Sequence, residues 1–177
     1  MKKLLFIALT LIPTLASAQF VRHTQGCGEI KANRDFTCSF GVTEDMDILT
    51  GVWTGFVNIM STSTRLEAGG GTITYDELPA LIQTLRYAKE NPPTRGDNGS
   101  TRIFFRSETI LEITCDLEAG ATPEAYIKID PVKPGSGVAA TIPWSRIDEL
   151  IAMLEKCRSI LDVHCAGKLT DTNTNSI

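Results

Sequence analysis

The chain has 177 residues, a formal net charge of −4 at pH 7, 42% hydrophobic residues and five cysteines. This length suits one domain, or two small units that share a core. Because an acidic chain does not attract phosphate backbones or anionic lipid heads, the charge disfavours nucleic-acid and membrane-surface partners.

The first 18 residues are typical of a bacterial signal peptide. Two lysines precede an apolar run at 4–15 that is too short to span a bilayer, and the small-residue pattern Ala-Ser-Ala ends at residue 18. Cleavage before Gln19 would leave 159 residues and lower the net charge to −6, because it removes two lysines and no acid. We therefore expect a periplasmic or secreted protein without a membrane span; the alternative is a retained N-terminal anchor.

Two stretches resemble each other at an offset of 69 residues: TITYDELPALIQTL at 72–85 and TIPWSRIDELIAML at 141–154. Tyr75 aligns with Trp144, and both lie where a strand is expected to lead into a helix. Beyond them, apolar residues recur at steps of three and four, the pattern of a helix with one buried face. These apolar residues are Leu78, Leu81, Ile82 and Leu85 in the first copy, and Ile147, Leu150, Ile151, Leu154, Cys157 and Leu161 in the second.

Extended patterns precede each helix, and the aligned residues Asp76 and Ser145 are the expected N-caps. We therefore predict an α+β fold of two tandem ββββα units, with antiparallel sheets each covered by one helix. The alternative is that two strand-to-helix junctions are alike by chance. The predicted units are 26–90 and 101–165, joined by a loop at 91–100 and followed by a disordered tail at 166–177. Their strands are expected at 36–42, 47–53, 55–60 and just before the first helix, then at 102–106, 109–117, 125–130 and just before the second.

This order of elements resembles the PUR and Whirly families, which use paired sheets to bind single-stranded nucleic acid. The resemblance lies in element order and covers most of the chain after residue 18, but no family motif can be carried over residue by residue. Export and acidic charge depart from those families. The pattern is also similar to that of small exported bacterial domains, a likeness that implies no activity.

The cysteines fit export, because an oxidising compartment permits disulfides. Cys27 and Cys38 bracket ten residues and are the preferred pair, which would stabilise the fold by about 2–4 kcal/mol. Other pairings stay open, since connectivity cannot be deduced from sequence. Cys115 on an inward-facing strand and Cys157 on the helix are either a buried disulfide or two buried thiols. Cys165 is the odd cysteine, a free thiol that would be able to join two chains.

Catalytic, cofactor and metal signatures are missing from the sequence. Cys157, His164 and Cys165 would lie near one side of a helix, but zinc prefers four ligands in close pairs and no CxxC motif occurs. His23 falls in an N-terminal segment expected to be flexible. No nucleophile motif surrounds either histidine, and the glycine-rich segment 67–72 lacks the lysine of a phosphate-binding loop. We expect no catalytic residue, no cofactor and no metal.

Acidic residues at the two predicted helix starts complement the helix dipoles, although paired carboxylates can also do acid–base chemistry in a cleft. The tripeptide Arg95-Gly96-Asp97 is a weak adhesion motif, and turn chemistry explains its Gly and Asp equally well. The acids at the helix starts are Asp76, Glu77, Asp148 and Glu149.

Three functions follow from these observations. The first is an exported, non-catalytic binding module for a protein or small ligand, which would use an exposed sheet face or the groove between units. The second is a hydrolase with an unrecognised carboxylate site. The third is binding of single-stranded nucleic acid, which would need aromatic and basic residues on one exposed face. The residues expected on that surface are Tyr126, Lys128, Arg102 and Arg106.

Overall fold

The computed structural model describes residues 19–32, 35–64, 68–96, 99–107, 111–117, 125–131 and 139–166. The predicted signal peptide at 1–18 and residues 167–177 of the predicted tail lie outside the described residues. None of the helices in the described ranges is long and apolar enough to cross a bilayer.

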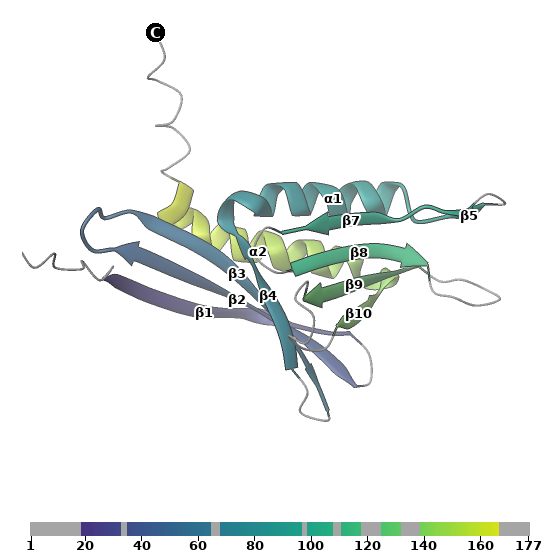
Figure 1. Cartoon of the computed structure of the whole chain (residues 1–177), viewed down its shortest axis with the longest axis horizontal. Coiled ribbons are helices and arrows are strands. Elements are labelled where there is room, and N and C mark those ends of the chain that lie inside the picture. The colour runs from purple at the N-terminus through teal and green to yellow at the C-terminus, as the bar shows by residue number, and fades with distance from the viewer. Residues whose placement is uncertain are drawn as a thin grey trace, which may run out of the picture.

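Two four-stranded antiparallel sheets, each followed by a helix, make up the fold (Figure 1). The predicted α+β fold of two tandem ββββα units is therefore confirmed. The first unit contains β1 (Phe20–Lys31), β2 (Phe36–Asp47), β3 (Trp53–Ser63), β4 (Ala68–Thr74), the 3-10 turn η1 (Tyr75–Glu77) and α1 (Leu78–Glu90). The short hairpin of β5 (Arg95–Gly96) and β6 (Gly99–Ser100) links it to the second unit. The second unit contains β7 (Ile103–Arg106), β8 (Leu111–Leu117), β9 (Ala125–Pro131), β10 (Ala140–Pro143), η2 (Trp144–Arg146) and α2 (Ile147–Cys165).

The strands of the first unit differ from the prediction at two places. The strand expected at 47–53 is wrong: β2 ends at Asp47, and a turn leads to β3. Gly51 in this turn has φ +68°, a left-handed conformation that glycine adopts without strain. The missing strand is β1, whose residues 20–26 are exposed and do not show the half-buried alternation by which strands are recognised.

The predicted helix N-caps are also wrong, because a 3-10 turn precedes each helix. Asp76 and Ser145 lie inside η1 and η2. Thr74 occupies the cap position of η1, where its amide and hydroxyl both donate to Glu77 Oε2 at 2.8 Å. Tyr75 and Trp144 each begin one of the two turns, so the predicted equivalence of the two junctions is confirmed.

Each sheet receives its helix from the other unit. Helix α2 packs against β1, β2 and β3 of the first sheet, while α1 lies along β7 of the second (Figure 1). The helices run antiparallel: Lys89 near the end of α1 forms a 2.6 Å ion pair with Asp148 near the start of α2. Between them, Arg86 pairs with Glu155, which is the position equivalent to Arg86 at the repeat offset of 69.

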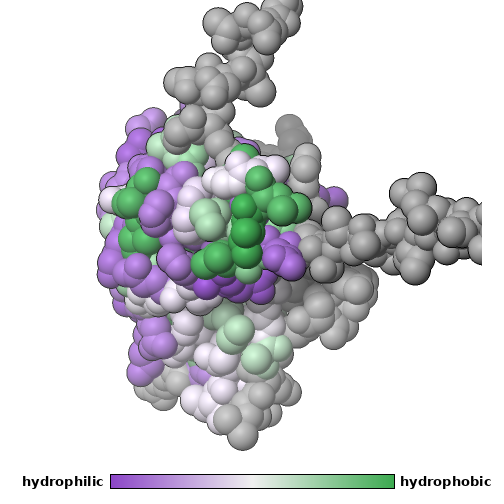
Figure 2. All heavy atoms as spheres, turned by 90° about the vertical axis from the view of Figure 1, so that its left-hand side faces the viewer, coloured by the Kyte–Doolittle hydropathy of each residue, from purple (hydrophilic) through white to green (hydrophobic). Residues whose placement is uncertain are grey.

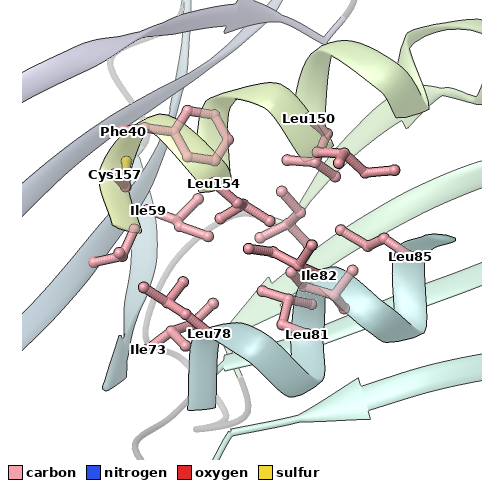
Figure 3. Close-up of a cluster of buried hydrophobic side chains, with 14 of the residues drawn as sticks. Phe40, Ile59, Ile73, Leu78, Leu81, Ile82, Leu85, Leu150, Leu154 and Cys157 are labelled. Atoms are coloured by element: carbon pink, nitrogen blue, oxygen red, sulfur yellow. The ribbon is translucent and has the colours of Figure 1, made fainter. Parts of the chain in front are cut away.

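The shared core forms where the two helices meet the two sheets. All the predicted stripe residues of both helices are buried. In Figure 3, Leu78, Leu81 and Ile82 of α1 face Leu150 and Leu154 of α2. Because the helices cross between the units, neither sheet buries its apolar face without residues from both halves of the chain.

Substitution of Gly55 by alanine tests the packing of α2 on the first sheet. A Cβ atom at Gly55 would lie 2.8 Å from Cys165 Sγ and 3.0 Å from Leu161 Cδ2, so we expect Gly55→Ala to lower the free energy of unfolding by about 1–3 kcal/mol. The matched control is Gly26→Ala, whose Cβ would meet nothing within 4 Å. Urea unfolding followed by circular dichroism measures both. Equal stability of the two variants would contradict the packing described here.

Candidate binding site

Large apolar side chains are exposed at the end of the first sheet where β1 begins and β2 turns into β3. In Figure 1 this end extends past the C-terminal end of α2. The register brings the residues together, because Val21 pairs with Met46 and the amide of Ile48 donates to the carbonyl of Gln19. We call this surface the apolar tip; it consists of Phe20 (52% exposed), Val21 (38%), Ile48 (49%), Leu49 (75%) and Val52 (43%).

Figure 2 looks onto this end of the molecule and shows two hydrophobic areas, with hydrophilic surface between and around them. Exposed apolar side chains are ordinary when they are scattered singly, whereas gathered ones mark interaction sites. The tip gathers five of them within two neighbouring chain segments.

A cluster of two imidazoles, an indole and a carboxylate lies next to the tip. His164, near the end of α2, stacks on Trp53 with ring centroids 4.4 Å apart and an angle of 14° between the rings. His23 of β1 contacts the same indole at 5.6 Å. Glu44 is buried, and its Oε1 lies 3.1 Å from His164 Nδ1. These contacts fix the indole at the edge of the apolar tip, since Trp53 is paired with Met46, which is paired with Val21.

Two hollows are lined by members of this cluster. One, of about 310 Å³, is lined by His23, Glu44, Val163 and His164 among others. The second, of about 210 Å³, is lined by Trp53, Gly55, Tyr75 and Cys165 among others. The 210 Å³ hollow is small for a drug-sized ligand and suits a single side chain of a partner better, whereas the 310 Å³ hollow is at the lower end of the range for small-molecule pockets.

Acidic groups surround the apolar tip. The Arg22 guanidinium donates two hydrogen bonds to Asp45, at 2.7 and 2.8 Å, and holds the pKa of that carboxyl below its ordinary value. Asp47 Oδ1 accepts from the amides of Leu49 and Thr50 and so fixes the turn of the tip. With Glu44, the described residues near the exposed apolar side chains include three acids and one arginine, an excess of negative charge.

The predicted surface of Tyr126, Lys128, Arg102 and Arg106 does come together on one face of the second sheet. Thr114 on β8 lies between Phe104 on β7 and Lys128 on β9. Two residues further along β8, Asp116 lies opposite Tyr126 and forms an ion pair with Arg102. Each cation has a carboxylate partner at 2.5–2.6 Å: Arg102 with Asp116, Arg106 with Glu112 and Lys128 with Asp130. The face is therefore balanced in charge, which disfavours a phosphate backbone as its ligand.

The acids at the helix starts lie at opposite ends of the antiparallel helix pair. Glu77 accepts from Ser107 and from Thr74, while Asp148 pairs with Lys89. Glu149 pairs with Arg146. These carboxylates serve local structure and do not converge on a cleft.

All five cysteines are buried thiols, and none is in a disulfide. The preferred pairing of Cys27 with Cys38 is not formed, because Cys38 lies opposite Ile30. Cys115 lies opposite Ile103 and Ile127 in the second sheet, whereas Cys157 on α2 faces the first sheet.

Two weaker predictions from the sequence concern Cys165 and the Arg95-Gly96-Asp97 tripeptide. Cys165 is buried beside Gly55, and a disulfide between two chains through Cys165 would have to undo this burial. The backbone of Arg95 and Gly96 forms β5, and Asp97 lies outside the described residues. Within the described parts of the chain, no group of three or more His, Cys, Asp or Glu side chains is placed to hold a metal ion.

No protein-family model matches this sequence, and no curated protein shows significant similarity to it. The candidate site therefore depends on geometry alone.

Sequence reasoning missed most of this site. His23 lies in strand β1 and not in a flexible segment, and the tip residues 48–52 lie in a turn and not in the strand predicted at 47–53. The signal that would have located them is the run Asp47 to Gly51, which combines a turn-capping acid with a glycine.

Tyr75 beside the second hollow provides a pH-dependent test of the contact between η1 and α2. Its hydroxyl donates to Asp162 Oδ1 at 2.6 Å, and burial together with this bond raises the pKa of Tyr75 to about 12. The neutral phenol is thus the stabilising form: its contribution is present below pH 10 and is lost as the pH rises through about 12. We expect Tyr75→Phe to cost about 1 kcal/mol at pH 8 and progressively less above pH 10.

Thermal unfolding of both proteins between pH 8 and pH 12 measures this difference. The matched control is Tyr87→Phe, because Tyr87 is 57% exposed on α1. A stability difference for Tyr75→Phe that stays constant up to pH 12 would show that the Asp162 bond is not formed.

Proposed function

We propose that the protein is an exported, non-catalytic binding module that holds a protein partner at the apolar tip and Trp53. The observation that carries this proposal is that Phe20, Ile48, Leu49 and Val52 are all exposed at one end of the first sheet. Trp is one of the residues that most often carry binding energy in protein interfaces, and Trp53 lies at the margin of this surface.

The chemistry of the tip favours a partner segment that is apolar and flanked by cations. The apolar residues supply the driving force for burial. Among the described residues there, Glu44, Asp45 and Asp47 outnumber the cation Arg22, so Lys or Arg on the partner would be attracted. Such attraction raises the rate of association more than the affinity and weakens with salt.

The alternative of a carboxylate hydrolase has less support. Paired carboxylates act on a bond only when they flank one substrate atom, whereas the acids of η1 and α2 are separated by the length of the helix pair. Nucleic-acid binding also has less support, because Arg102, Arg106 and Lys128 are each paired with an acid. The binding module remains the function that the geometry favours.

A binding experiment with matched surface variants tests the proposal. The protein is immobilised, envelope proteins of its source are passed over it, and any captured protein is purified and titrated against it. We expect the double variant Leu49→Asp, Val52→Asp to weaken binding at least tenfold, because it places charge in the buried centre of the interface. Phe104→Asp is the control, since Phe104 is 64% exposed on the second sheet.

Binding that survives the tip variant, or that is lost only in Phe104→Asp, would overturn the assignment of the surface. Light scattering of the protein alone at high concentration shows whether the tip binds a second copy of the chain instead. Salt-sensitive binding of a single-stranded oligonucleotide at micromolar affinity would favour the nucleic-acid alternative.

A further inference from the structure

Strand β1 contains an extra residue at the point where it passes under α2. Gly26 pairs with Gly41 and Gly28 pairs with Phe40, so Cys27 between them has no partner on β2. Such a β-bulge redirects the side chain of the inserted residue. The Cys27 side chain is buried, with 4% of the residue exposed.

Side chains from one turn of helix α2 contact β1 at this bulge. The Lys156 ammonium donates to the carbonyl of Cys27. Met153 lies over Gly28, where a Cβ atom would approach its Cε to 2.8 Å. Gly28, at φ +152°, therefore lets the strand come close to the helix.

Cys157 lies on the same turn of α2, is fully buried, and faces the first sheet near Phe40 (Figure 3). Lys156 and Met153 contact the bulge on either side of Cys27, and Cys157 follows Lys156 directly, so the Cys27 side chain lies close to that of Cys157, although the two sulfur atoms are not at bonding distance. The bulge, the glycine and the helix turn thus bring together two cysteines that lie far apart in sequence. The other buried cysteines have different neighbours, with Ile30 opposite Cys38 and Ile127 opposite Cys115.

We propose that Cys27 and Cys157 form a disulfide that ties the first strand of one unit to the helix of the other. The oxidant is a disulfide compound, either a small molecule or a protein. One cysteine attacks it as the thiolate to give a mixed disulfide, and the second thiolate displaces the leaving thiol. The two cysteines lose two protons and two electrons, and the oxidant is reduced to two thiols.

The timing of the reaction follows from burial. Removal from water, together with the neighbouring Cys27 thiol, raises the pKa of the Cys157 thiol, so the folded protein holds little reactive thiolate. The disulfide therefore forms as the chain folds, or when α2 separates briefly from β1, and is protected from reductants once the core has closed. Because the bond closes most of the chain into one loop, it restricts the unfolded chain strongly.

Thiol counting and peptide mapping of the purified protein test the proposal without any substitution. After unfolding and refolding in a mixture of oxidised and reduced glutathione, we expect three of the five thiols to react with a maleimide in denaturant. A single linked peptide should contain Cys27 and Cys157. The thermal midpoint should rise by about 5 °C or more over the reduced protein and fall back on reduction.

Five reactive thiols, or a linked peptide that joins Cys27 to Cys38, would overturn the proposal. Cys38→Ser is the matched control, since Cys38 is buried in the same sheet, and it should still lose two thiols on oxidation. Cys157→Ser should lose none. The proposal is independent of the tip as a binding site, because neither cysteine lies in the tip.

Discussion

The exchange of helices between the two halves is the constraint on which the rest of the structure depends. A four-stranded sheet with one apolar face needs a cover, and each sheet here takes its cover from the distant half of the chain. The antiparallel pair of α1 and α2 is therefore part of the core under both sheets. The pairing of Arg86 with its own repeat equivalent, Glu155, shows that the two halves meet about a local twofold relation at the centre of the helices.

The fold class was predictable because its signals are local. The three- and four-residue steps of Leu78 to Leu85 and of Ile147 to Leu161 define buried helix faces, and every member of these stripes is buried. The exchange was not predictable, since the same stripe covers an adjacent sheet or a distant one equally well. Cys157 illustrates this: its place on the stripe was evident, but its neighbour was taken to be Cys115 in the adjacent sheet.

The errors in the first unit and the candidate site concern the same residues. Ile48, Leu49 and Val52 have the composition of a buried strand, yet they are exposed in a turn fixed by Asp47 and Gly51. Composition shows that a residue is hydrophobic, but it does not show whether the residue is buried in the core or exposed on the surface. An exposed apolar surface therefore resembles core in the sequence, and β1, which borders that surface, resembles a flexible segment because so few of its first residues are covered within the chain.

The crossing of the helices also bears on how such a chain would arise. A lone ββββα unit with its helix extended away from its own sheet would leave that sheet uncovered in solution. Such a unit would be able to cover its sheet by forming a domain-swapped dimer, in which each copy packs its helix on the sheet of the other. Joining the end of one copy to the start of the next would then convert helix exchange within a dimer into contacts within one chain. The two halves would afterwards be able to diverge in sequence, one toward binding a partner and the other toward stabilising the fold.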